Sequence, residues 1–124
     1  MNFASTADKY PAERASLARL ERIVGEVAGG GVEYTFNRLC DLAKPRSREG
    51  FALALGELVQ RGFLQQIVRV LSPTTQGGIA EYPSLRDVPP LIHDWRADLE
   101  FEVRPEHLLV IYRAQIPPSG HGHP

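Results

Sequence analysis

The sequence predicts a single α+β domain, in which a three-helix bundle is followed by a β-hairpin or a small three-stranded sheet with a long loop. Apolar side chains in the N-terminal half recur at the 3.6-residue period of a helix. Beyond Gly62 the chain becomes rich in β-branched residues, and near residue 100 apolar and charged side chains alternate as in a half-buried strand. A length of 124 residues suits one domain built around one core.

The first helix is expected to begin close to Pro11, because the first turn of a helix does not need the N–H that proline lacks. Its apolar stripe consists of Leu17, Leu20, Val24 and Val27. Gly29, Gly30 and Gly31 are expected to end this helix, because residues without a Cβ favour neither helix nor strand. Residues 1–9 would then form an N-terminal arm.

Two further helices follow, separated by a short turn. Thr35 is a candidate N-cap for the second helix, which Pro45 stops. Ser47 is a candidate N-cap for the third helix, which ends near Gly62. A turn of about three residues is typical of a helix-turn-helix pair. The apolar stripe of the second helix includes Cys40, which predicts a buried and inert thiol.

The C-terminal half is expected to form strands. Residues 63–71 contain several β-branched side chains, and residues 99–104 and 107–113 are expected to pair as a hairpin. Residues 72–98 are rich in proline and glycine and form a long loop with a short helical turn or strand inside it. The domain is therefore predicted over residues 10–116, before a disordered tail at 117–124.

The apolar pattern of residues 35–64 resembles that of the winged helix-turn-helix superfamily. The matching residues are Phe36, Leu39, Ala43, Phe51, Leu55, Leu58, Gly62 and Leu64. The resemblance implies a winged helix whose long loop belongs to the wing. In DNA-binding members of the superfamily the third helix lies in the major groove. Because one fold hosts many functions, the resemblance names no partner.

The outward face of the third helix lacks the side chains that read bases. Its positions are Glu49, Gly50, Ala52, Leu53, Gly56, Glu57 and Gln60. Two carboxylates would face phosphates, and small or apolar residues make few hydrogen bonds to base edges. Protein recognition is therefore the preferred prediction, with Ala52, Leu53 and Gly56 as the interaction surface and Trp95 as a second anchor. Two alternatives stay open: Leu53 lies beneath another element, and Trp95 packs on the edge of the core.

The alternative function is binding to duplex DNA. The candidate phosphate contacts are Lys44, Arg46, Arg48, Arg61 and Arg69. Residues 35–72 carry a net charge of +3, whereas residues 73–124 carry a net charge of −3. An acidic wing, with Glu100, Glu102 and Glu106, opposes contact with a phosphate backbone.

Catalysis, cofactors and metals are not predicted. His93 and His107 each have an acidic neighbour in sequence, but adjacent side chains diverge in an extended chain. His121 and His123 could supply two metal ligands, with no third close by in the sequence. The glycines at 29–31 follow a helix and do not match a phosphate-binding loop.

The composition places the chain among ordinary globular proteins. The net charge of −1 and the 43% of hydrophobic residues identify no class of ligand. A single cysteine precludes an internal disulfide, and no secretory signal or membrane span is evident, so we expect a cytoplasmic protein. The architecture is similar to that of adaptor domains of prokaryotic signalling, defence or regulatory assemblies. The sequence leaves open the oligomeric state and whether the chain is one domain of a longer protein.

Overall fold

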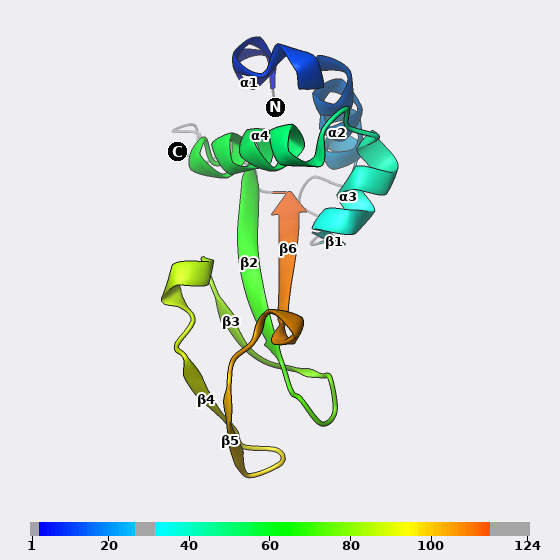
Figure 1. Ribbon diagram of the computed structural model, residues 1–124. Helices are drawn as coiled ribbons and strands as arrows, with labels where there is room; N and C mark the ends of the chain where they lie inside the picture. The colour runs from blue at the N-terminus through cyan, green and yellow to red at the C-terminus, as the bar shows by residue number, and fades with distance from the viewer. Residues whose placement is uncertain (1–2, 27–31, 115–124) are drawn as a thin grey trace, which may run out of the picture. The chain divides into compact units, whose positions relative to one another are not determined.

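The computed structural model describes residues 3–26 and 32–114, with most strands after the α-helices (Figure 1). The α-helices are α1 (Ala4–Lys9), α2 (Arg14–Glu26), α3 (Phe36–Ala43) and α4 (Arg48–Gln60). The strands are β1 (Glu33–Thr35), β2 (Leu64–Leu71), β3 (Gly78–Tyr82), β4 (Leu91–Asp94), β5 (Leu99–Glu102) and β6 (Leu108–Ala114). Short 3-10 helices lie at Pro11–Glu13, Leu85–Asp87 and Pro105–His107. The expected tail at 117–124 and Val27 lie outside the described residues.

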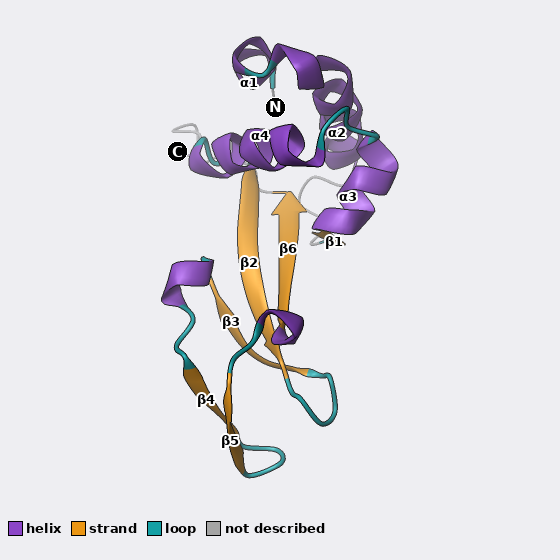
Figure 2. Cartoon of the chain, in the orientation of Figure 1, coloured by secondary structure: helices purple, strands orange, loops and turns teal. Residues whose placement is uncertain are grey.

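The chain divides into two compact units. Residues 1–65 together with 112–124 form the first, called here the helical unit. Residues 66–111 form the second, called here the strand unit. Figure 2 shows that the helical unit holds α1 to α4, whereas the strand unit holds β3, β4 and β5.

The core of the helical unit follows the predicted helical stripes. Its fully buried apolar side chains include Leu17, Leu20, Leu39, Ala43, Phe51, Ala54, Leu55 and Leu58. Both predicted N-caps are confirmed. The hydroxyl of Thr35 accepts a hydrogen bond from the Arg38 N–H at 3.1 Å, and the hydroxyl of Ser47 accepts one from the Gly50 N–H at 3.0 Å.

Two charged residues hold the turn between α3 and α4: Glu13, which lies just before α2, and Arg19, which lies within α2. The carboxylate of Glu13 is buried and accepts hydrogen bonds from the N–H groups of Arg46 and Ser47, each at 3.1 Å. The guanidinium of Arg19 donates to the carbonyl oxygens of Ala43 at 2.6 Å and Lys44 at 3.1 Å. An anion therefore sits at the N-terminus of α4 and a cation at the C-terminus of α3, as the helix dipoles favour.

The prediction of a three-helix bundle is wrong, because the described chain contains four α-helices. The additional helix is α1, which lies where we expected an N-terminal arm. Phe3 is fully buried, and its ring lies 5.4 Å from that of Phe63. The apolar content of residues 3–7 is too small to predict a helix, and burial against distant residues supplies the missing stabilisation.

The predicted hairpin between residues 99–104 and 107–113 is also wrong. β6 instead joins a four-stranded sheet in the order β1-β6-β2-β3, and β5 pairs with β4 in a separate two-stranded sheet. The residues between β5 and β6 form a 3-10 turn that starts at Pro105, and the Arg104 N–H donates to Nδ1 of His107 at 3.0 Å. Alternation of side chains predicts the two faces of a strand, but it does not predict the neighbouring strand.

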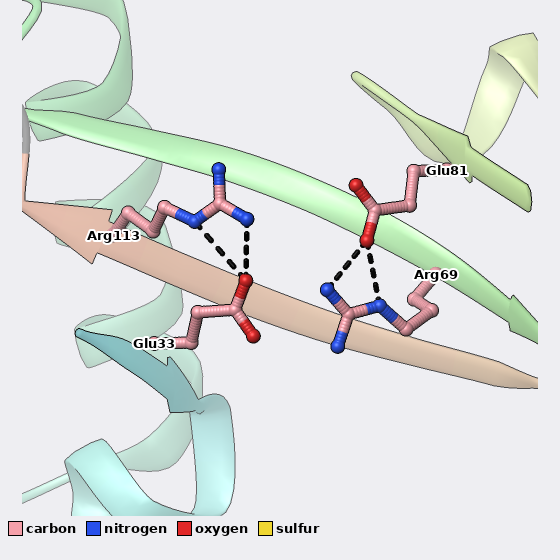
Figure 3. Close-up of polar contacts among 4 residues, drawn as sticks. All are labelled: Glu33, Arg69, Glu81 and Arg113. Carbon is pink, nitrogen blue, oxygen red and sulfur yellow. Dashed lines mark hydrogen bonds and ion pairs between the residues drawn. The ribbon is translucent and has the colours of Figure 1, made fainter. Parts of the chain in front are cut away.

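Ion pairs link neighbouring strands within each unit (Figure 3). In the helical unit, Arg113 of β6 pairs with Glu33 of β1. In the strand unit, Nε of Arg69 on β2 donates to Glu81 of β3 at 2.7 Å. Arg69 and Glu81 face each other directly in the antiparallel register of β2 and β3. The opposite charges therefore support this pairing.

Candidate protein-interaction surface

Helix α4 presents one face to the core and one to the solvent. Phe51, Ala54, Leu55 and Leu58 are buried. Leu53 lies on the opposite side and is 62% exposed, and its neighbour Ala52 is also exposed. The alternative in which another element covers Leu53 is therefore excluded within the described residues.

Gly56 makes a notch in this exposed face. A Cβ built at Gly56 has no atom within 4 Å, so packing inside the chain does not demand glycine. Glycine in a helix interior costs about 1 kcal/mol relative to alanine. Gly56 therefore lowers the stability of α4, and no contact among the described residues explains why glycine stands there. We call the surface formed by Ala52, Leu53 and Gly56 the α4 patch.

A carboxylate network borders the α4 patch. Glu57 accepts hydrogen bonds from Nζ of Lys9 at 3.0 Å and from Nε of Arg61 at 2.7 Å. The hydrogen bond from Lys9, followed by the weaker effect of the one from Arg61, holds the pKa of Glu57 below its ordinary value. The contact with Lys9 also joins α1 to α4. The exposed residues Glu49 and Gln60 lie nearer the two ends of α4.

Three of the five predicted phosphate contacts have partners within the chain. Arg48 donates to Asn37 and lies over the ring of Phe36, with 5.1 Å from its guanidinium carbon to the ring centroid. Arg61 pairs with Glu57, and Arg69 pairs with Glu81. The other two, Lys44 and Arg46, are exposed on the turn between α3 and α4.

The N-terminus of α4 is already occupied by an anion. Helix N-termini bind phosphate through N–H groups that lack partners in the helix. In this chain Glu13 accepts from the N–H groups of Arg46 and Ser47, and the hydroxyl of Ser47 accepts from Gly50. The buried Glu13 is the residue that the sequence did not single out, because its partners lie more than 30 residues away along the chain.

Trp95 belongs to the strand unit and lies in the turn between β4 and β5. Its side chain is 66% exposed, so the alternative of a packed tryptophan is wrong within the described residues. The guanidinium of Arg96 stacks on the indole, with its carbon 5.3 Å from the ring centroid. The predicted interaction residues therefore fall on both units, and only the α4 patch brings three of them together.

The two described histidines, His93 and His107, have different partners. Nε2 of His93 lies 3.2 Å from Asp98, and Nδ1 of His107 accepts from the Arg104 backbone. His107 also lines a pocket of about 230 Å³ with Ser72, but the Ser72 hydroxyl donates to Asp94 at 2.5 Å. A serine nucleophile needs a base that takes its proton during attack, and a carboxylate with a lowered pKa is a poor one.

The candidate ligands of a metal ion are histidine, cysteine and acidic side chains, and the one cysteine of the chain lies among the described residues. Among residues 3–26 and 32–114 no three histidine, cysteine or acidic side chains gather as metal ligands. His121 and His123 lie outside the described residues. Cys40 is buried as predicted, and its burial raises the pKa of the thiol. No helix in the described part of the chain has the length and apolar character to cross a membrane.

Comparison of the chain with protein families, with curated proteins and with solved structures gives no match. The resemblance of residues 35–64 to winged helix-turn-helix proteins therefore stays a prediction.

Proposed function

We propose that this chain is a non-catalytic protein-interaction module and that the α4 patch is its docking surface. The observation that carries the proposal is the exposure of Leu53 beside the notch at Gly56. An exposed leucine alone is ordinary on a protein surface. Leucine next to a helix-weakening glycine is better explained by a partner that packs closely against the helix.

The partner that suits this surface is a helix with an apolar stripe and flanking lysine or arginine side chains. Small residues let two helix backbones approach, and Ala52 and Gly56 supply them here. Glu49 is exposed at the N-terminal end of α4, where it lies within reach of a basic residue on the partner. Such a partner would cover Leu53 without burying an unpaired charge.

The second candidate function is weak binding to duplex DNA, supported by the exposed Lys44 and Arg46. Phosphate contacts of this kind position a protein without reading sequence. Two free cations would give modest affinity that falls steeply with salt. Two observations favour protein recognition over this alternative. Glu13 already occupies the N-terminus of α4, and Arg48 and Arg61 have partners within the chain.

The experiment compares Leu53→Asp with Ala15→Asp, a matched change at an exposed position of α2. We expect both variants to keep the thermal unfolding midpoint of the wild type, because both side chains project into solvent. The wild type should capture a partner protein from extracts of the source cells. The Ala15→Asp variant should capture the same protein, and the Leu53→Asp variant should not. If Leu53→Asp unfolds the chain, or captures every protein that the wild type captures, the proposal is wrong.

A further inference from the structure

The two-stranded sheet of the strand unit leaves β5 with an open edge. β5 pairs with β4 in an antiparallel register that joins Leu91 to Glu102 and Asp94 to Leu99. Within the described residues β5 has no other strand beside it. A two-stranded ribbon is marginally stable by itself, and an open edge presents N–H and C=O groups to any strand that fits.

The two faces of β5 differ in chemistry. Glu100 and Glu102 lie on one face, opposite His93 and Leu91, and all four side chains are exposed. Leu99 and Phe101 lie on the other face. Leu99 is 45% exposed and Phe101 is half-buried. Carboxylates therefore alternate with apolar side chains along this edge.

The ribbon is anchored within the strand unit. The buried carboxylate of Asp94 accepts from the Ser72 hydroxyl and from the N–H groups of Arg96 at 3.1 Å and Ala97 at 3.3 Å. At the other end of the ribbon, the ring of Phe101 meets that of His107 edge to face, with 5.1 Å between centroids. An edge held in one conformation loses little entropy when a strand is added.

We propose that the open edge of β5 binds an extended segment of another protein in which lysine or arginine alternates with apolar residues. The basic side chains would lie beside Glu100 and Glu102, and the apolar ones beside Leu99 and Phe101. Main-chain hydrogen bonds supply affinity and the alternating charges supply specificity.

Charge disfavours two other occupants of this edge. A second copy of β5 would place carboxylates beside carboxylates, which destabilises strand pairing. The strand unit has four Lys or Arg and seven Asp or Glu residues, a net charge of −3, which repels nucleic acid. This proposal does not depend on the α4 patch.

The probe is a synthetic nine-residue peptide of alternating lysine and valine. Three control peptides accompany it: one with glutamate in place of lysine, one with the same residues in scrambled order, and one with N-methylated backbone amides. Binding is followed by the fluorescence of Trp95, the one tryptophan of the chain, and by amide chemical shifts. We expect the lysine peptide to bind at least tenfold more tightly than each control and to shift the amides of residues 99–102.

Charge reversal tests the assignment to β5. Glu100→Lys combined with Glu102→Lys should reverse the preference, so that the glutamate peptide binds better. Asp87→Lys combined with Glu106→Lys makes the same charge change off the strand and should keep the preference of the wild type. Leu53→Asp should bind the lysine peptide as the wild type does, which separates this edge from the α4 patch.

Three outcomes would overturn the proposal: equal binding of the lysine and glutamate peptides, unchanged binding after N-methylation, or amide shifts away from β5. The N-methylated peptide is tested on the wild-type protein, so this arm remains decisive if the charge-reversed variant does not fold.

Discussion

At the scale of single residues, Glu13 carries more of the fold than its place in the sequence suggests. One carboxylate accepts from the Ser16 hydroxyl at 2.8 Å and from two backbone N–H groups at the start of α4. A donor that loses its acceptor inside the protein no longer offsets the free-energy cost of its removal from water. Glu13 therefore couples the start of the first long helix to the start of α4.

Removal of this carboxylate should destabilise the chain strongly. We expect Glu13→Ala to lower the free energy of unfolding by about 2–4 kcal/mol, because it leaves the buried Ser16 hydroxyl and two partly buried N–H groups without their acceptor. Asp41→Ala removes an exposed carboxylate from α3 and should change it by less than about 0.5 kcal/mol. Urea denaturation measures both changes. Equal effects of the two substitutions would show that Glu13 does not hold the turn.

Asp94 predicts a dependence of stability on pH. The hydrogen bond from the Ser72 hydroxyl lowers the pKa of Asp94 from its ordinary value of 3.8, and the N–H groups of Ala97 and Arg96 add to this effect. A lowered folded-state pKa stabilises the fold above the unfolded value, and this contribution is lost as the pH falls through the folded value.

Asp94→Asn should therefore lower the melting temperature at pH 7, and the difference from the wild type should shrink as the pH falls below 3.8. Melting curves at closely spaced pH values measure the difference, with Asp87→Asn as an exposed control. A difference that stays constant down to pH 2 would contradict the assigned role of the carboxylate.

At the scale of elements, the helices were more predictable than the strand pairing. The helical period and the N-caps Thr35 and Ser47 located α3 and α4, since these signals lie within a few residues of each other. The partners of β5 and β6 were not predictable, because pairing depends on contacts between residues far apart in sequence. The short α1 was missed for a similar reason, since its stabilising partner at Phe63 is distant.

The same limit applies to the candidate site. The outward positions of α4 followed from its period, but the period left open whether another element covers Leu53, because such cover depends on residues far away in sequence. The pairing of Arg69 with Glu81 was not predictable, because the two residues meet only through the register of β2 and β3. A count of cations in sequence therefore overstated the charge available to phosphates.

Gly56 allows a test that separates folding from binding. We expect Gly56→Ala to raise the free energy of unfolding by about 0.5–1 kcal/mol, because alanine favours the helix and its Cβ meets no atom of the chain. The same methyl group should weaken capture of the partner by filling the notch. Gly25→Ala in α2 also enters open space and serves as the control. If Gly56→Ala stabilises the chain and captures the partner as well as the wild type does, Gly56 is not part of the binding surface.

At the scale of the whole molecule, the distribution of charge opposes a nucleic-acid partner. The strand unit carries −3, and the helical unit carries +2 from ten basic and eight acidic residues. Several of the ten basic side chains are engaged inside the helical unit, including Arg19, Arg48 and Arg61. The remaining positive charge is small.

We accordingly expect duplex DNA to bind with a dissociation constant above about 100 µM at physiological salt, the weak end of non-specific binding. Fluorescence anisotropy of a random duplex at low and moderate salt measures this affinity. Arg46→Ala combined with Arg48→Ala is the comparison variant. Micromolar binding at moderate salt that this variant abolishes would promote the DNA-binding alternative.

Site-specific photo-cross-linking within the source cells tests the role of the α4 patch most directly. A benzophenone amino acid is placed at position 53 and, as a control, at the exposed position 15. We predict one discrete protein adduct from position 53 and none from position 15. Adducts to DNA, the same adducts from both positions, or no adduct from position 53 would contradict the assignment of this helix face to a protein partner.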